Sequence, residues 1–170
     1  TISETITFLT TGSGKTITVD DGAGHSQLSN SFTVNAGALD KFAIAAVGAQ
    51  TAGTAFNITI TAQDANGNTV TSYSGAGNTV DLTDNTGTIF PATSGTFSSG
   101  VRTQSVTITK AQSGVQITVS GAGKVGLSSG FTVNPAALDH FAVTNTSDGN
   151  ITTQFAGQGF SIKIAAKDQY

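Results

Sequence analysis

The residues with the clearest potential for chemistry form a short run of oxygen-bearing side chains near the middle of the chain. Asp64, Asn66 and Asn68 alternate with Ala65 and Gly67, so oxygens recur at every second position, as at the start of a calcium-binding loop. Such a loop also needs a bidentate acid several positions later, and residues 69–73 are Thr-Val-Thr-Ser-Tyr. The same residue types favour a hairpin turn. We interpret the run as a turn, with a Ca²⁺ site on Asp64, Asn66 and Asn68 as the alternative.

Other acidic residues offer further cation candidates. Asp81 and Asp84 could hold a cation, but we expect solvated acids there. Asp40 and Asp139 lie near the expected domain junctions, where Ca²⁺ could bind between neighbouring domains. Ca²⁺ is therefore the one cofactor that the sequence leaves open.

The remaining reactive residues give no catalytic set. Lys41, Asn35 and Asp40 suggest an internal isopeptide bond, but Lys41 is replaced by His140 at the matching repeat position, and strand alternation turns Lys41 outward. His25 and His140 have no second His or Cys at ligand spacing, so we expect solvated side chains. No Gly-x-Ser-x-Gly motif occurs, and the carboxylates are too dispersed for a glycosidase pair. The sequence predicts no catalytic residue, no cofactor-binding residue and no enzyme activity.

Three Asn-x-Ser/Thr sequons could accept glycans, at Asn57, Asn145 and Asn150. Asn57 lies on the expected outward face of a strand. Chance matches are common in a chain this rich in Asn and Thr, so these sites depend on a source that glycosylates its surface.

Composition limits the class of protein. The chain of 170 residues is 37% hydrophobic with a net charge of −3, whereas disordered chains combine low hydrophobicity with high net charge. It contains no Cys, which excludes disulfides and thiolate sites. The seven basic residues are scattered, which argues against nucleic-acid binding, and no apolar run suggests membrane contact. Low charge with abundant Thr, Ser, Asn and Gly favours an extracellular, cell-surface location.

Apolar and polar residues alternate at period two along nearly every segment, which predicts an all-β chain. Residues 56–62 place Phe, Ile, Ile and Ala on one face. Residues 125–133 are expected to form one strand with Val125, Leu127, Ser129, Phe131 and Val133 on a common face. About seven short strands in about 100 residues is the count of an immunoglobulin-like β-sandwich.

The strand pattern repeats along the chain. Residues 32–42 and 131–141 carry nearly the same sequence 99 positions apart, and residues 56–64 match 160–168. The repeat predicts tandem domains: the C-terminal strands of one in residues 1–35, a complete one in residues 36–135, and the N-terminal strands of a third in residues 136–170. Two or three isolated strands are marginally stable, so we expect the chain to be a piece of a longer polypeptide.

The complete copy resembles the bacterial immunoglobulin-like tandem repeats of large surface proteins, of the invasin and intimin type. Segments 38–42, 51–53, 62–70 and 131–133, together with Gly100, carry the resemblance through their order and spacing. The resemblance implies an extracellular array that acts as a stalk, an adhesin shaft or an envelope layer, and it implies no particular ligand.

We expect a structural segment of a large cell-surface protein, in which very short linkers at residues 35–36 and 134–135 make a stiff stalk, fibre or envelope layer. Its partners would be neighbouring repeats and other copies in a fibre or surface layer. One alternative is an adhesin or carbohydrate-binding module, although Tyr73 and Tyr170 are the only Tyr and Trp is absent. Another is a self-assembling filament subunit, because residues 1–35 and 136–170 are complementary portions of one domain.

Overall fold

The computed structural model describes residues 1–170 and contains β-strands but no α-helix. No helix is long and apolar enough to cross a membrane. The strands are β1 (Gly12–Lys15), β2 (Thr18–Asp20), β3 (Ser26–Leu28), β4 (Phe32–Val34), β5 (Lys41–Ile44), β6 (Gln50–Thr51), β7 (Phe56–Gln63), β8 (Asp81–Asp84), β9 (Val101–Val106), β10 (Gln112–Val115), β11 (Ile117–Gly121), β12 (Lys124–Leu127), β13 (Phe131–Asn134), β14 (His140–Thr144) and β15 (Lys163–Lys167).

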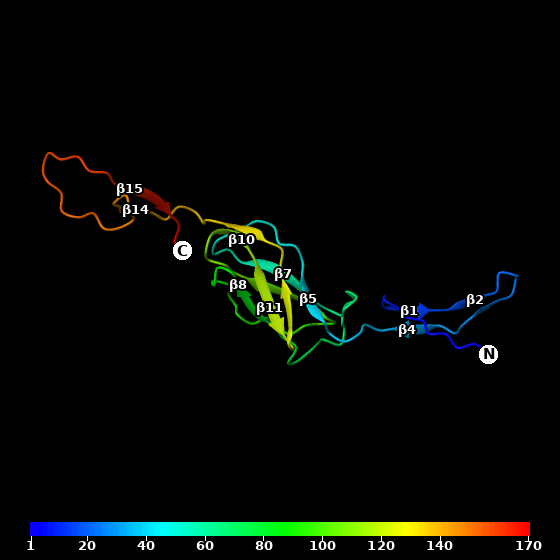
Figure 1. The fold of residues 1–170 in the computed structure, drawn as a ribbon. Coiled ribbons are helices and arrows are strands. Elements are labelled where there is room, and N and C mark those ends of the chain that lie inside the picture. Colours follow the sequence, from blue (N-terminus) through cyan, green and yellow to red (C-terminus); the bar gives the residue numbers. More distant parts are fainter.

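The strands form a central sandwich with a smaller part at each end. Strands β5–β13 make the sandwich, β1–β4 form the leading part, and β14 and β15 form the trailing hairpin (Figure 1). All 17 residues of the buried hydrophobic core belong to the sandwich, between Phe42 and Val133. The two flanking parts lie at opposite ends of the sandwich, so the molecule is elongated.

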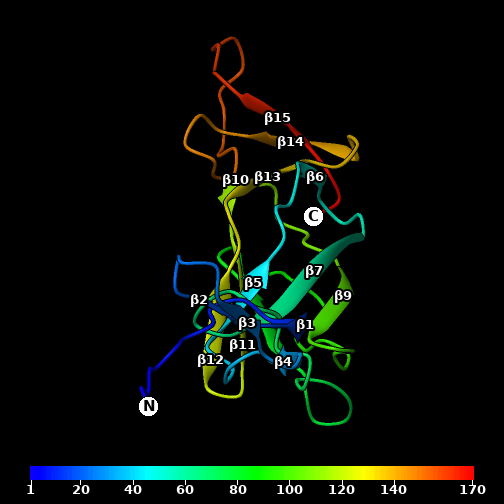
Figure 2. The same ribbon diagram turned by 90° about the vertical axis from the view of Figure 1, so that its right-hand side faces the viewer.

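The sandwich packs one sheet, in the order β5-β7-β9, against two shorter sheets, in the orders β12-β11-β8 and β10-β13-β6. Strand β12 lies against β5, and β6 pairs with β13 in parallel (Figure 2). Alternation along β7 explains the packing, because Ile58, Ile60 and Ala62 are buried while Asn57 is exposed. At one end of the core, Tyr73 packs edge-on against Phe42 and Phe97, with ring centroids 5.4 and 5.0 Å away. The prediction of an all-β, immunoglobulin-like sandwich is confirmed.

The expected single strand over residues 125–133 was wrong. The structure divides it into β12 and β13, and Val125 and Leu127 are 58% and 57% exposed, whereas Gly126 faces the interior. A Cβ at Gly126 would overlap the backbone of Phe42, so only glycine lets β12 lie this close to β5. Ser128 lies between β12 and β13, and its hydroxyl accepts the backbone N–H of Ile117 on β11 at 2.9 Å. The pattern of buried positions thus shifts by one residue between the two strands.

The flanking parts repeat the strand pairings of the sandwich. Strands β1 and β4 pair with the same register shift as β10 and β13, and β2 and β3 pair as β11 and β12 do. Strands β14 and β15 reproduce the register of β5 and β7. Ser29 also accepts the Ile17 N–H at 2.9 Å, as Ser128 does for Ile117. The sequence repeat is therefore also a repeat of hydrogen bonding.

Candidate functional site

The alternating run of Asp and Asn lies where the leading part meets the sandwich. Asp64 directly follows β7, and its side chain is buried with a residue exposure of 3%. One carboxylate oxygen, Oδ1, accepts the backbone N–H groups of Asn66 and Asn68 at 2.9 and 2.8 Å. The other, Oδ2, accepts the backbone N–H of Gly37 at 2.9 Å. A single carboxylate therefore closes the hairpin turn and fixes the chain that enters the sandwich.

Asn68 connects this carboxylate to the leading part. Its side-chain Nδ2 donates to Asp64 Oδ2 and to the backbone carbonyl of Leu9, both at 2.9 Å. Its Oδ1 accepts the backbone N–H of Thr11 at 3.2 Å. These contacts form one continuous chain of hydrogen bonds, which we call the first joint. Its members are Leu9, Thr11, Asn68, Asp64 and Gly37. Two of its bonds join residues 57 and 59 positions apart, so it links separate parts of the fold.

The first joint stabilises the ionised form of Asp64. The hydrogen bond from the Asn68 side chain has the largest effect, followed by that from Gly37, and together they lower the pKa of Asp64 from 3.8 to about 2. Five donor contacts to one carboxylate explain the direction, because each favours the charged oxygen over the protonated one. The joint is therefore complete at neutral pH.

The first joint should loosen only in strong acid. Because the pKa of Asp64 is lower in the folded joint than its ordinary value, its contribution is fully present above pH 3.8 and is lost as the pH falls toward about 2. An NMR titration of the Gly37 and Asn68 amide signals should give a midpoint of about 2. Asp64→Asn serves as the control and should abolish the transition. A midpoint at the ordinary value of 3.8 would contradict the arrangement.

A related arrangement lies at the other end of the sandwich. Asp168 Oδ2 accepts the Ala136 N–H at 2.8 Å, as Asp64 does for Gly37, and its Oδ1 accepts the Tyr170 N–H at 3.1 Å. We call this the second joint. Both strand pairs also begin with the same backbone hydrogen bond. The Asp40 N–H donates to the Gln63 carbonyl, and the Asp139 N–H donates to the Lys167 carbonyl, each at 2.8 Å.

The second joint differs from the first at the position of Asn66. Tyr170 stands there, and its ring lies so close to Gly53 that a Cβ on this glycine would overlap it. A cleft of about 450 Å³ opens beside Tyr170, between the sandwich and the trailing hairpin. It is lined on the sandwich side by Thr109 and Ala111, the counterparts of Leu9 and Thr11.

The calcium alternative for Asp64, Asn66 and Asn68 stays a prediction. The structure brings Asp64 and Asn68 together, but both carboxylate oxygens face N–H groups. Asn66 is exposed and its side chain makes no hydrogen bond. No group of three or more His, Cys, Asp or Glu side chains comes together in the chain.

The other acidic candidates lie apart from the joints or at their edges. Asp84 accepts the backbone N–H groups of Thr88 and Ile89 at 2.9 and 3.0 Å, so it closes a turn. Asp81 accepts the Thr93 hydroxyl at 3.2 Å. Asp40 is 3.8 Å from the ammonium group of Lys124, an exposed pair that adds little stability.

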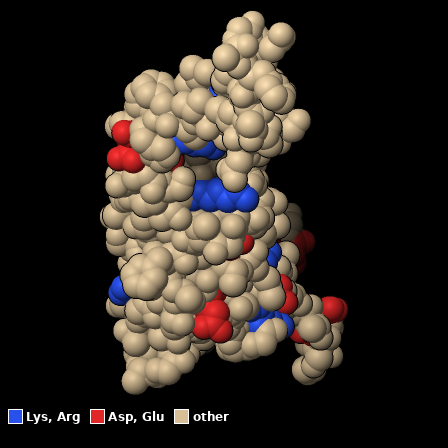
Figure 3. All heavy atoms as spheres, turned by 90° about the vertical axis from the view of Figure 1, so that its left-hand side faces the viewer, with Lys and Arg blue, Asp and Glu red and all other residues tan.

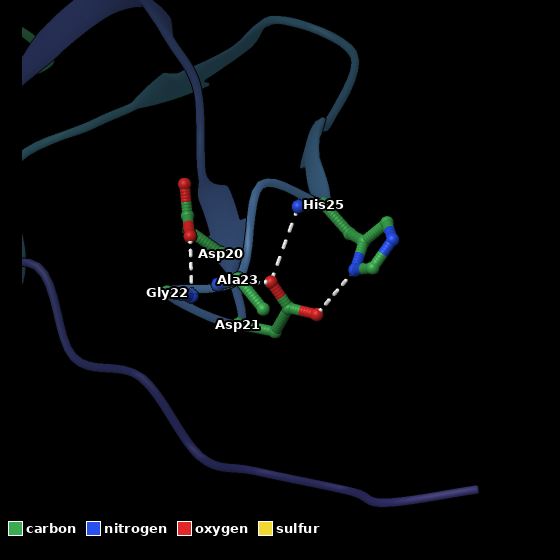
Figure 4. Close-up of polar contacts among 5 residues, drawn as sticks. All are labelled: Asp20, Asp21, Gly22, Ala23 and His25. Atoms are coloured by element: carbon green, nitrogen blue, oxygen red, sulfur yellow. Dashed lines mark hydrogen bonds and ion pairs between the residues drawn. The ribbon is translucent and has the colours of Figure 1, made fainter.

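Both histidines are exposed and each contacts one carboxylate. His25 Nδ1 lies 2.6 Å from Asp21 in the turn between β2 and β3 (Figure 4). This contact is the largest cause that lowers the pKa of Asp21. His140 Nδ1 lies 2.9 Å from the neighbouring Asp139. Lys41 is exposed, as strand alternation predicts.

The sequons occupy two kinds of position. Asn57 is exposed on β7 and Asn150 is exposed in the loop before β15. The Asn145 carboxamide is engaged in that loop, where it accepts the N–H groups of Ser147 and Gly149 at 2.9 Å. Glycosylation at these three residues stays a prediction.

Charged groups are sparse on the surface. Figure 3 shows only a few basic and acidic side chains on a face that is otherwise uncharged. This agrees with the scattered distribution of the seven basic residues along the sequence.

Sequence reasoning missed Gly37, Leu9 and Thr11, because they take part in the first joint through backbone groups. A backbone donor or acceptor leaves no trace in residue type. The one available signal was the recurrence of Asp64 as Asp168 at the same place in the repeat.

The chain matches no protein-family model and no curated protein. Solved structures with a similar fold include FdeC, an Escherichia coli adhesin, with 19% identity and a TM-score of 0.46. The match covers 87% of this chain and 48% of the FdeC chain. Domains 4–9 of the surface layer protein SbsC match with 18% identity and a TM-score of 0.42, over 86% of this chain and 23% of that one. The chain therefore spans half or less of each neighbour, and the similarity concerns fold alone.

Proposed function

We propose that the chain is a structural segment of a large extracellular protein at a bacterial surface, in which successive immunoglobulin-like repeats are held in line. The observation that carries the proposal is the first joint, where Asn68 binds the leading part and the buried Asp64 at once. Hydrogen bonds from both sides of a short linker restrict bending. Such a segment acts mechanically, as part of a stiff stalk, fibre or envelope layer. Membership of the invasin and intimin group is the finer form of this proposal.

The neighbouring repeats are the first partners that this role needs. Phe141 and Ile164 of the trailing hairpin are both 61% exposed, whereas their counterparts Phe42 and Ile60 in the sandwich are 3% and 0% exposed. Exposed apolar side chains that are buried at the equivalent positions of the complete sandwich point to a surface that other protein covers. We propose that further repeats cover them and that other copies of the chain assemble beside them in a fibre or layer.

NMR relaxation of the 170-residue chain tests the proposed stiffness. If the first joint holds, the leading part and the sandwich should tumble as one body, and the amides of Thr11 and Gly37 should exchange slowly with solvent. Exchange at these two amides measures the first joint directly, because the Thr11 N–H donates to Asn68 and the Gly37 N–H donates to Asp64. Independent tumbling of the leading part, with fast exchange at Thr11, would refute the proposal.

A further inference from the structure

We propose that Asn66 is a site of spontaneous deamidation, and that its conversion loosens the first joint. The inference rests on the proposed function, because it assigns a covalent change that regulates the same joint. It requires no enzyme and no reactant other than water.

The sequence singles out Asn66. It is the only one of the ten asparagines in the chain that is followed by glycine. A side chain on the following residue shields the backbone nitrogen from the Asn carboxamide, and Gly67 has none. No atom lies within 4 Å of the place that a Cβ on Gly67 would occupy, so no other group crowds this side of the turn.

The structure leaves the Asn66 carboxamide free. Asn66 is exposed and its side chain makes no hydrogen bond, so it can turn toward the Gly67 nitrogen at little cost. The Gly67 N–H donates to the Asp64 carbonyl at 3.0 Å, and this bond must open first. Exposed turns open with small free energies, so the opening does not require the sandwich to unfold.

The reaction is an internal substitution. The Gly67 nitrogen loses its proton and bonds to the Asn66 Cγ, the side-chain amide leaves as ammonia, and a cyclic imide remains. Water then adds to one of the two imide carbonyls and opens the ring. One product is Asn66→Asp, and the other is an isoaspartyl linkage, in which the backbone is lengthened by a methylene carbon.

Either product acts on Asp64 and Asn68. The N–H groups of Asn66 and Asn68 both donate to Asp64 Oδ1, so a longer backbone between them moves Asn68 away from its partners. The new carboxylate also repels the ionised Asp64. We therefore expect the bonds from Asn68 to Leu9 and Thr11 to weaken.

The comparable Asp-Gly pairs are less prone to this reaction. Asp21-Gly22 and Asp148-Gly149 could form the same imide, but an ionised carboxylate is a poor acceptor for the attacking nitrogen. The contact with His25 at 2.6 Å lowers the pKa of Asp21, which favours its ionised form. The Asp148 carboxylate is engaged by the Lys163 ammonium at 2.7 Å. In the trailing part, Tyr170 replaces Asn66, which confines the change to the first joint.

Ageing of the intact chain tests the proposal. The protein is incubated in mildly alkaline and in mildly acidic buffer, and each asparagine is followed by peptide mass analysis, with the other nine as internal controls. Asn66 should convert first, and faster in the alkaline buffer, because the attacking nitrogen must lose its proton. Converted chains should lose the slow exchange of the Thr11 amide.

Asn66→Gln is the matched variant. It keeps an exposed carboxamide, but its cyclisation needs a larger and slower-forming ring, so the aged variant should retain Thr11 protection. Conversion of Asn66 no faster than the other asparagines, or conversion that leaves Thr11 protected, would overturn the proposal. Fast exchange of Thr11 in the fresh protein would instead refute the proposed function, while the mass analysis would still report on Asn66 itself.

Discussion

Asn68→Ala should release the leading part from the sandwich without unfolding the sandwich. The substitution removes the donor to Leu9 O and the acceptor for Thr11 N–H, the two side-chain bonds that cross the first joint. Each hydrogen bond contributes roughly 0.5–1.5 kcal/mol, so the coupling between the two parts should fall by about 1–3 kcal/mol. NMR relaxation should show the leading part tumbling separately, and the melting temperature of the sandwich should change little.

Two further variants make this prediction specific. Asn66→Ala is the control, because Asn66 belongs to the same turn but its side chain makes no bond, and it should leave the joint intact. Asn68→Asp should be more disruptive than Asn68→Ala, because it loses the donor and places a second carboxylate against Asp64. If Asn68→Ala and Asn66→Ala behaved alike, Asn68 would have no part in holding the joint.

Phe97→Ala should cost the sandwich a large fraction of its stability. Phe97 is 2% exposed and packs against Phe42 and Tyr73, with ring centroids 5.8 and 5.0 Å away. Replacing a buried Phe by Ala leaves a cavity and typically costs about 3–5 kcal/mol, against a total of roughly 5–15 kcal/mol for a domain. Denaturant unfolding followed by circular dichroism should show the midpoint moving strongly downward.

Phe155→Ala is the matched control for this change. Phe155 is 77% exposed in the loop before β15, so its removal creates no cavity, and the unfolding free energy should stay within about 0.5 kcal/mol of the original. Equal effects of the two substitutions would mean that the aromatic cluster around Phe97 does not stabilise the sandwich.

The strands and their repetition could be predicted from local sequence. Alternation over residues 56–62 gave the buried face of β7, and the match between residues 32–42 and 131–141 anticipated the shared pairings of the flanking parts. Both features depend on the two-residue period of a strand, which near neighbours in sequence determine.

The same local rule failed over residues 125–133. Val125 and Leu127 alternate in phase with Phe131 and Val133 in the sequence, yet they face solvent. The interruption at Ser128 and the contact of Gly126 with Phe42 decide which face is buried. That contact joins residues far apart along the chain, so periodicity within one segment does not contain it.

For the joint, sequence and tertiary structure contributed different things. The sequence by itself determined the turn at residues 64–68 and the recurrence of its Asp as Asp168, because turn chemistry is local. Only the tertiary structure decided that Asp64 is buried against Gly37 and that Asn68 reaches Leu9 and Thr11. The physical reason is that backbone N–H and carbonyl groups are the same in every residue type except proline. Which of them meets a side chain depends on the path of the whole chain.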